Sequence, residues 1–174
     1  MRVGCTLIGV AVAIPDPWGA QIEGWRASFG DPRADAIPAH ITLLPPTVVE
    51  DGLLDAVDAH LRDAASGLSP FEVHLRGTGT FRPVSPVVFV SLASGISGFE
   101  SLESLVRQGI LEREVEFPYH PHVTVAHDLP GNVLDEAYET LSDFSARFTV
   151  SGFALYVHGE DGVWQVRRRY DLGG

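Results

Sequence analysis

The stretch YHPHVTVAH, residues 119–127, contains three of the seven histidines of this 174-residue chain. Within it, HVTV at 122–125 has the pattern histidine, apolar residue, threonine, apolar residue, and HITL at 40–43 has the same pattern. In an extended strand, side chains two positions apart lie on the same face. Each copy therefore predicts a strand with an imidazole and a hydroxyl on one face and apolar side chains on the other.

The two copies lie at matching places in two similar halves of the chain. Apolar periodicity and chain-breaking residues predict the order strand, helix, strand, helix, strand twice. The first half has these elements at 5–14, 16–31, 39–44, 50–67 and 71–81, and the second at 86–93, 97–110, 121–126, 131–144 and 146–159. A last strand follows at 163–172. His122 follows His40 by 82 positions, and the same shift places the first strand and both helices over their counterparts.

This repeat predicts an α+β fold of two pseudo-symmetric lobes, roughly residues 1–84 and 85–174, with a central cleft between them. Each lobe is expected to be a mostly antiparallel sheet flanked by helices. Because no linker separates the halves, we expect a single domain over residues 1–174. The composition, with 45% apolar and 20% charged residues, is typical of a globular protein.

The formal net charge of −11 argues against binding along a nucleic-acid backbone, which requires an excess of Lys and Arg. We therefore expect no DNA partner. The apolar run at 5–14 is too short to span a membrane and lacks a signal-peptide cleavage pattern. A single cysteine excludes a disulfide framework. The expectation is a cytoplasmic monomer without membrane contact.

Two imidazoles and two hydroxyls suit displacement at phosphorus. Histidine titrates near neutral pH, so one ring can accept a proton from the nucleophile while the other donates one to the leaving oxygen. The hydroxyls of Thr42 and Thr124 can donate hydrogen bonds to the non-bridging phosphate oxygens. The pattern predicts His40 and His122 as a catalytic pair, and it leaves open which is the acid and which the base.

The two motifs, their spacing and the duplicated halves resemble the 2H phosphoesterase superfamily, in particular the 2'-5' RNA ligase-like or cyclic phosphodiesterase family. The resemblance implies a bilobal α+β fold and phosphodiester chemistry on 2',3'-cyclic phosphates, 2'-5' linkages or related cyclic nucleotides. It implies no metal or other cofactor, and His40, Thr42, His122 and Thr124 as the catalytic set. Many members carry a basic residue soon after the second motif, where this chain has His127. That departure weakens the expected grip on phosphate. Together with the acidic net charge, the resemblance therefore implies a small nucleotide or an RNA terminus as substrate rather than a long duplex.

Other residues are further candidates. His120 could orient His122, or it could lie near solvent at the strand end. Tyr119 could stack on a base. Arg76 and Arg82 flank a glycine-rich stretch that could approach a phosphate closely, although ordinary surface arginines would give the same sequence.

Two alternatives to a metal-independent enzyme follow from the same residues. His120, His122 and His127 could bind zinc, but the threonines of the motifs would then have no role. No metal site is therefore expected. The lobes could also form a module that binds a nucleotide or RNA end without turnover. Two matched proton-transfer groups favour the enzyme.

Overall fold

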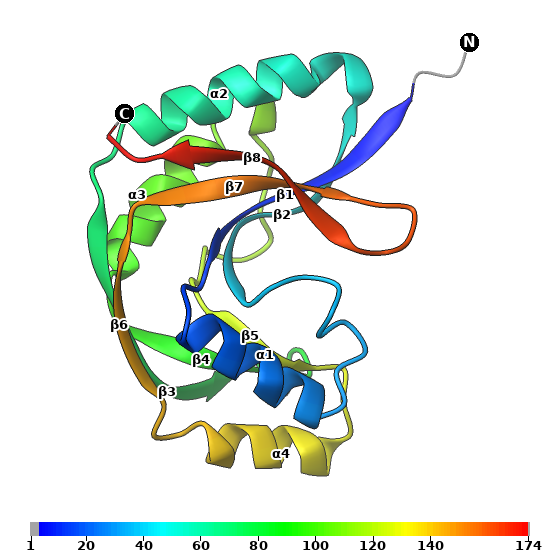
Figure 1. Cartoon of the computed structure of the whole chain (residues 1–174), viewed down its shortest axis with the longest axis vertical. Helices are drawn as coiled ribbons and strands as arrows, with labels where there is room; N and C mark the ends of the chain where they lie inside the picture. Colours follow the sequence, from blue (N-terminus) through cyan, green and yellow to red (C-terminus); the bar gives the residue numbers. More distant parts are fainter. Residues whose placement is uncertain (1–3, 174) are drawn as a thin grey trace.

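Two four-stranded antiparallel sheets form the frame of the protein in a computed structural model, which describes residues 4–173 (Figure 1). The first sheet has the order β2-β1-β7-β8, with bounds Cys5–Ala13 for β1, His40–Glu50 for β2, Gly152–His158 for β7 and Trp164–Asp171 for β8. The second has the order β5-β4-β3-β6, with bounds Phe71–Thr80 for β3, Val87–Ser94 for β4, Val123–His127 for β5 and Ser145–Val150 for β6. The predicted α+β class with two related lobes is confirmed.

The helices are exchanged between the two halves of the chain. They span Trp18–Ser28 (α1), Leu54–Ser66 (α2), Ile96–Val106 (α3) and Gly131–Thr140 (α4), with short 3-10 turns at Asp51–Leu53 and Gly109–Leu111. Helix α1 joins β1 to β2 but contacts β5, whereas α3 joins β4 to β5 but contacts β2. Helix α2 packs beside α3 and β8, and α4 packs on β3, β4 and β5. Each sheet is therefore covered by a helix from the other half, which holds the two sheets together.

One continuous apolar core runs through both sheets. The apolar residues that follow the two histidines, Ile41 and Val123, are both fully buried in it. Phe99 on α3 is also fully buried and meets Phe71 of β3 edge to face, with ring centroids 5.2 Å apart. Burial of the alternate residues on β2 and β5 leaves the histidines and threonines of the motifs facing away from the core.

The predicted boundary between lobes near residue 84 does not divide the sheets. Strand β3 pairs with β4 and β6 in the second sheet, and β7 returns to pair with β1 in the first. The stretch 146–159, predicted as one strand, is two strands that separate at Ser151 and join different sheets (Figure 1). Buried residues alternate along β6, whereas Phe153 to Tyr156 of β7 are all buried, so the alternation ends at Ser151 and Gly152, where the chain changes sheet. Both strands are rich in apolar residues and no proline separates them, which is why the sequence predicted one strand.

Strand β2 is longer than predicted, because it continues through Pro45 and Pro46 to Glu50. It lies at the edge of its sheet, where a residue without an N–H group leaves no ladder donor missing. Its register against β1 is irregular opposite Gly9, next to the prolines. Among residues 4–173, no helix is long and apolar enough to cross a membrane.

Replacing Ile41 should test whether the motif strand is anchored by the core. Ile41→Ala is expected to lower the free energy of unfolding by about 2–5 kcal/mol, because it leaves a cavity in a fully buried site. Val48→Ala on the same strand is the matched control, since Val48 is 68% exposed, and it should cost less than about 1 kcal/mol. Urea unfolding measures both. Equal losses in the two variants would contradict this packing.

Candidate active site

The two His-x-Thr motifs meet where the two sheets adjoin. Strands β2 and β5 are edge strands of different sheets, and they contact each other. His40 is the first residue of β2, and His122 directly precedes β5. The side chains of His40, Thr42, His122 and Thr124 are all half-buried. The predicted catalytic residues therefore come from opposite halves of the chain to one junction.

The two imidazole rings are held in the same way. Nδ1 of His40 lies 2.8 Å from the carbonyl oxygen of Pro38, and Nδ1 of His122 lies 2.6 Å from that of His120. In each case the partner is the carbonyl two residues earlier. A carbonyl oxygen only accepts hydrogen bonds, so each Nδ1 must carry the hydrogen. Nε2 is then the atom of each ring that accepts or releases a proton.

Burial lowers the pKa of both histidines. For His40, desolvation is the largest cause, the Pro38 carbonyl opposes it, and the positive charges of Arg26 and His122 reinforce it. For His122, desolvation is again the largest cause, opposed by the His120 carbonyl and reinforced by the His120 ring. The influence of His122 on His40 means that protonating one ring disfavours protonating the other. A state in which one ring is protonated and the other is neutral is therefore favoured over a state in which both rings are protonated.

Two hollows meet at Thr42. The larger hollow has a volume of about 770 Å³, is mostly apolar and is lined by His122; we call it the His122 hollow. Its walls include Thr42, Pro45, Phe81, Val84, Arg107, Glu116, Phe117, Tyr119, His120 and His122. The second, of about 380 Å³, is more polar and is called the His40 hollow. Its walls include Arg26, Asp31, Arg33, Ile37, His40, Thr42, Thr124, His127 and Asp128.

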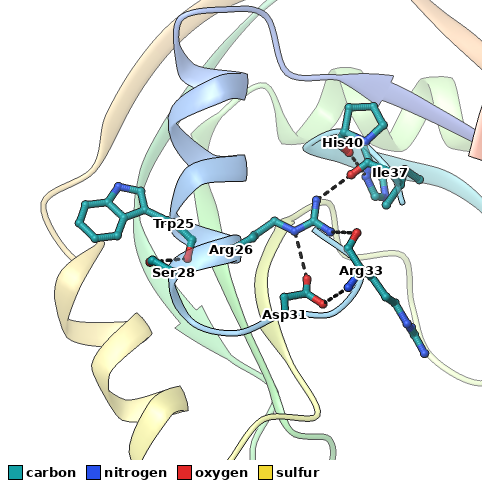
Figure 2. Close-up of polar contacts among 8 residues, drawn as sticks. Trp25, Arg26, Ser28, Asp31, Arg33, Ile37 and His40 are labelled. Atoms are coloured by element: carbon teal, nitrogen blue, oxygen red, sulfur yellow. Dashed lines mark hydrogen bonds and ion pairs between the residues drawn. The ribbon is translucent and has the colours of Figure 1, made fainter. Parts of the chain in front are cut away.

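A buried arginine organises the chain that leads to His40 (Figure 2). Arg26 lies on the same face of α1 as buried Ile22, one turn later, and is only 5% exposed. Its guanidinium pairs with the Asp31 carboxylate at 3.2 Å and donates hydrogen bonds to the carbonyls of Arg33 at 3.1 Å and Ile37 at 2.9 Å. We call Arg26 and Asp31 the clamp. It fixes the connection from α1 to β2 at three points just before Pro38, the hydrogen-bond partner of His40.

Tyr119 links the two motif segments. Its hydroxyl donates a 2.6 Å hydrogen bond to the backbone carbonyl of Thr42 on β2. Burial and the nearby Glu103 carboxylate raise the pKa of the phenol, so the hydroxyl keeps its hydrogen. The stacking role suggested by the sequence stays a prediction for this residue. The ring forms part of the wall of the His122 hollow, and the hydroxyl makes a hydrogen bond across the junction that the sequence did not predict.

His120 and His127 lie in different hollows. The exposed ring of His120 packs against Phe81, Phe89 and His122, with centroids 5.3, 5.2 and 5.7 Å away, and its carbonyl orients His122. His127 is half-buried in the His40 hollow, and its Nε2 lies 3.3 Å from the Asp128 carboxylate. No group of three or more His, Cys, Asp or Glu side chains among residues 4–173 could hold a metal ion.

Arg76 and Arg82 do not line either hollow. Arg76 is exposed on β3, opposite Ser145 of β6. Arg82 pairs with Asp135 of α4 at 2.8 Å and donates to the Thr80 hydroxyl. The glycines between these arginines lie within β3 rather than in a turn, so they form no phosphate-binding loop.

The arginines that the structure places at the hollows are Arg26, Arg33 and Arg107. No motif in the sequence pointed to these three arginines. Arg107 follows α3, is almost buried and pairs with Glu103 at 3.0 Å. Arg26 lies in the last turn of α1 and Arg107 directly follows α3, and these are the first helices of the two halves. The internal repeat therefore held a signal that could have identified both arginines.

Comparison with known proteins agrees with this arrangement. The family model described as the 2'-5' RNA ligase superfamily matches residues 14–162. This chain belongs to that family. A relative from Bacillus licheniformis, named "Putative phosphoesterase", is 30% identical over 145 residues, covering 82% of this chain and 85% of its own length.

Solved structures share the fold over nearly the whole chain. A crystal structure titled as a phosphoesterase has a TM-score of 0.74 at 21% identity, covering 97% of this chain and 99% of its own. LigT of E. coli in complex with 3'-AMP has a TM-score of 0.73 at 21% identity, with the same coverage of both chains. The family membership supports phosphoesterase activity.

Breaking the clamp should cost stability. Arg26→Met leaves the Asp31 carboxylate, which is 9% exposed, without its partner, so the free energy of unfolding should fall by about 3–5 kcal/mol. Arg62→Met is the matched control, because Arg62 is 61% exposed in its ion pair with Asp58, and it should cost less than about 1 kcal/mol. Denaturant unfolding measures both variants. Similar losses in the free energy of unfolding would contradict the stabilising role of the clamp.

Nitrogen NMR of the imidazole rings should reveal the tautomers and their titration. We expect the neutral His40 and His122 rings to carry hydrogen on Nδ1. We also expect both rings to protonate only below about pH 6.5, the ordinary pKa of a histidine side chain. The unfolded chain takes up these protons more readily, so stability should fall as the pH drops below that value. His40→Gln and His122→Gln assign the signals. Hydrogen on Nε2 in either ring would contradict the orientation described above.

Proposed function

We propose that this protein hydrolyses or forms phosphodiester bonds of the 2',3'-cyclic or 2'-5' type, in a nucleotide or at an RNA end, without a metal ion. The observation that carries the proposal is the matched pair of histidines, each fixed through Nδ1 to the carbonyl two residues earlier. This arrangement leaves Nε2 of both rings available for proton transfer at one junction.

In hydrolysis of a 2',3'-cyclic phosphate, Nε2 of one neutral histidine takes a proton from water as its oxygen attacks phosphorus. The bond from phosphorus to one ribose oxygen breaks, and Nε2–H of the other, charged histidine protonates that oxygen. The product is a phosphomonoester with a free neighbouring hydroxyl. The Thr42 and Thr124 hydroxyls donate hydrogen bonds to the non-bridging oxygens, where charge increases during the displacement. Running the same steps backward forms the bond.

A small substrate suits the surroundings of the site. The chain carries a net charge of −11, and long nucleic acids require many cationic contacts. The apolar His122 hollow has aromatic walls that could accept a base by stacking. The fold neighbour LigT has been crystallised with 3'-AMP, ATP and NADP+, which are single nucleotides or dinucleotides. A nucleotide or a terminal nucleotide of RNA is therefore the proposed substrate.

Turnover of the four 2',3'-cyclic mononucleotides in EDTA, followed by phosphorus NMR, tests this proposal. We expect hydrolysis to one regioisomer, a loss of at least about 10³-fold in kcat for His40→Ala and His122→Ala, and smaller losses for Thr42→Ala and Thr124→Ala. His60→Ala is the matched control, because this histidine bonds the Val106 carbonyl away from both hollows and should keep wild-type activity.

Turnover that survives in either catalytic variant would refute the two-histidine mechanism. If the wild-type protein binds a nucleotide but turns over none of the cyclic or 2'-5' substrates, the lobes act as a binding module instead.

A further inference from the structure

We propose that Arg33 is the residue that binds the substrate phosphodiester in the His40 hollow, held in place by the clamp. This inference rests on the proposed function and adds the cation that the sequence motifs do not provide. Arg33, in the connection before the first motif, takes the phosphate-binding role for which Arg76 and Arg82 were candidates from the sequence.

The backbone of Arg33 is fixed on both sides. Its N–H donates to Oδ1 of Asp31 at 2.9 Å, and its carbonyl accepts a hydrogen bond from Nη2 of Arg26 at 3.1 Å. Farther along the connection, the Ala36 carbonyl accepts from the N–H of Trp164 at 2.9 Å, which ties the segment to the start of β8. The position from which the Arg33 side chain extends is therefore well defined (Figure 2).

The guanidinium of Arg33, in contrast, has no hydrogen bond or ion pair with any residue in the range 4–173. The side chain is exposed and extends away from the clamp (Figure 2). It lines the His40 hollow together with His40 and both motif threonines. It also lines an adjoining space of about 180 Å³ beside His40, Thr42 and Trp164. A fixed backbone with an unpaired cationic end is the arrangement expected of a ligand-binding residue.

The other arginines near the hollows already have carboxylate partners. Arg26 pairs with Asp31, and Arg107 pairs with Glu103. Among residues 4–173, Arg33 is thus the arginine of the His40 hollow whose charge remains available.

One available guanidinium matches the charge of the proposed substrate. A phosphodiester carries a single negative charge, and the planar fork of arginine can donate two parallel hydrogen bonds to its oxygens. Asp31 and Asp128 also line this hollow, and their carboxylates would repel further phosphate groups. The site is therefore suited to a singly charged diester, and a terminal polyphosphate suits it less well.

Binding and kinetics of Arg33→Gln test this inference. The affinity for adenosine 3'-monophosphate, measured by calorimetry in EDTA, should fall about 10- to 100-fold, and Arg33→Lys should lose less. Arg76→Gln is the matched control, because Arg76 is an exposed arginine outside the hollows, and it should bind like wild type. The melting temperature should not change in Arg33→Gln, since the guanidinium has no partner in the described structure.

The assignment would be overturned if Arg33→Gln bound the probe as tightly as wild type, or if Arg33→Gln and Arg76→Gln lost equal affinity. It would also be overturned if the wild-type protein did not bind the probe at millimolar concentration. Because binding is measured without turnover, the two proposals can fail separately. An inactive wild-type protein whose probe affinity depends on Arg33 would refute the reaction alone. An active one whose affinity and KM do not depend on Arg33 would refute only the role of Arg33.

Discussion

The contact between the edge strands β2 and β5 is the constraint on which the site depends. Each strand belongs to a different sheet, and neither sheet alone contains two histidines of the motif. The exchanged helices α1 and α3 hold this contact, because each packs on the motif strand of the other half. The hydrogen bond from Tyr119 to the Thr42 carbonyl adds a polar link at the same place. Loss of this contact would separate the two proton-transfer groups.

The site is symmetric in its histidines and asymmetric in its surroundings. Both rings use Nδ1 in the same way. Beyond them, the His40 side has the Arg26–Asp31 pair and the unpaired Arg33, whereas the ring of His122 packs against Phe81 and Phe89 with centroids 4.9 and 5.3 Å away. A pseudo-symmetric frame can therefore support an asymmetric substrate, with the polar hollow suited to phosphate and the apolar hollow suited to a base.

The sequence predicted the parts of this arrangement that leave a local pattern. The repeated His-x-Thr motif indicated the two strands and their shared face, because alternation in a strand is a local property. The exchange of strands and helices was not predictable in this way. The alternation of buried residues in β6 ends at Ser151 and Gly152, but this local break does not indicate that β6 and β7 enter different sheets. The role of Arg26 depends on carbonyls seven and eleven residues away, which only the folded connection brings together.

In the proposed reaction, one phosphorus atom lies between the two histidines. A crystal structure of the protein with orthovanadate, which mimics the five-coordinate phosphorus of in-line displacement, would reveal this arrangement. We predict vanadium with Nε2 of His40 and Nε2 of His122 on opposite sides, and the hydroxyls of Thr42 and Thr124 on its equatorial oxygens. Vanadate bound through only one of the histidines, or at a site that contacts neither threonine, would contradict it.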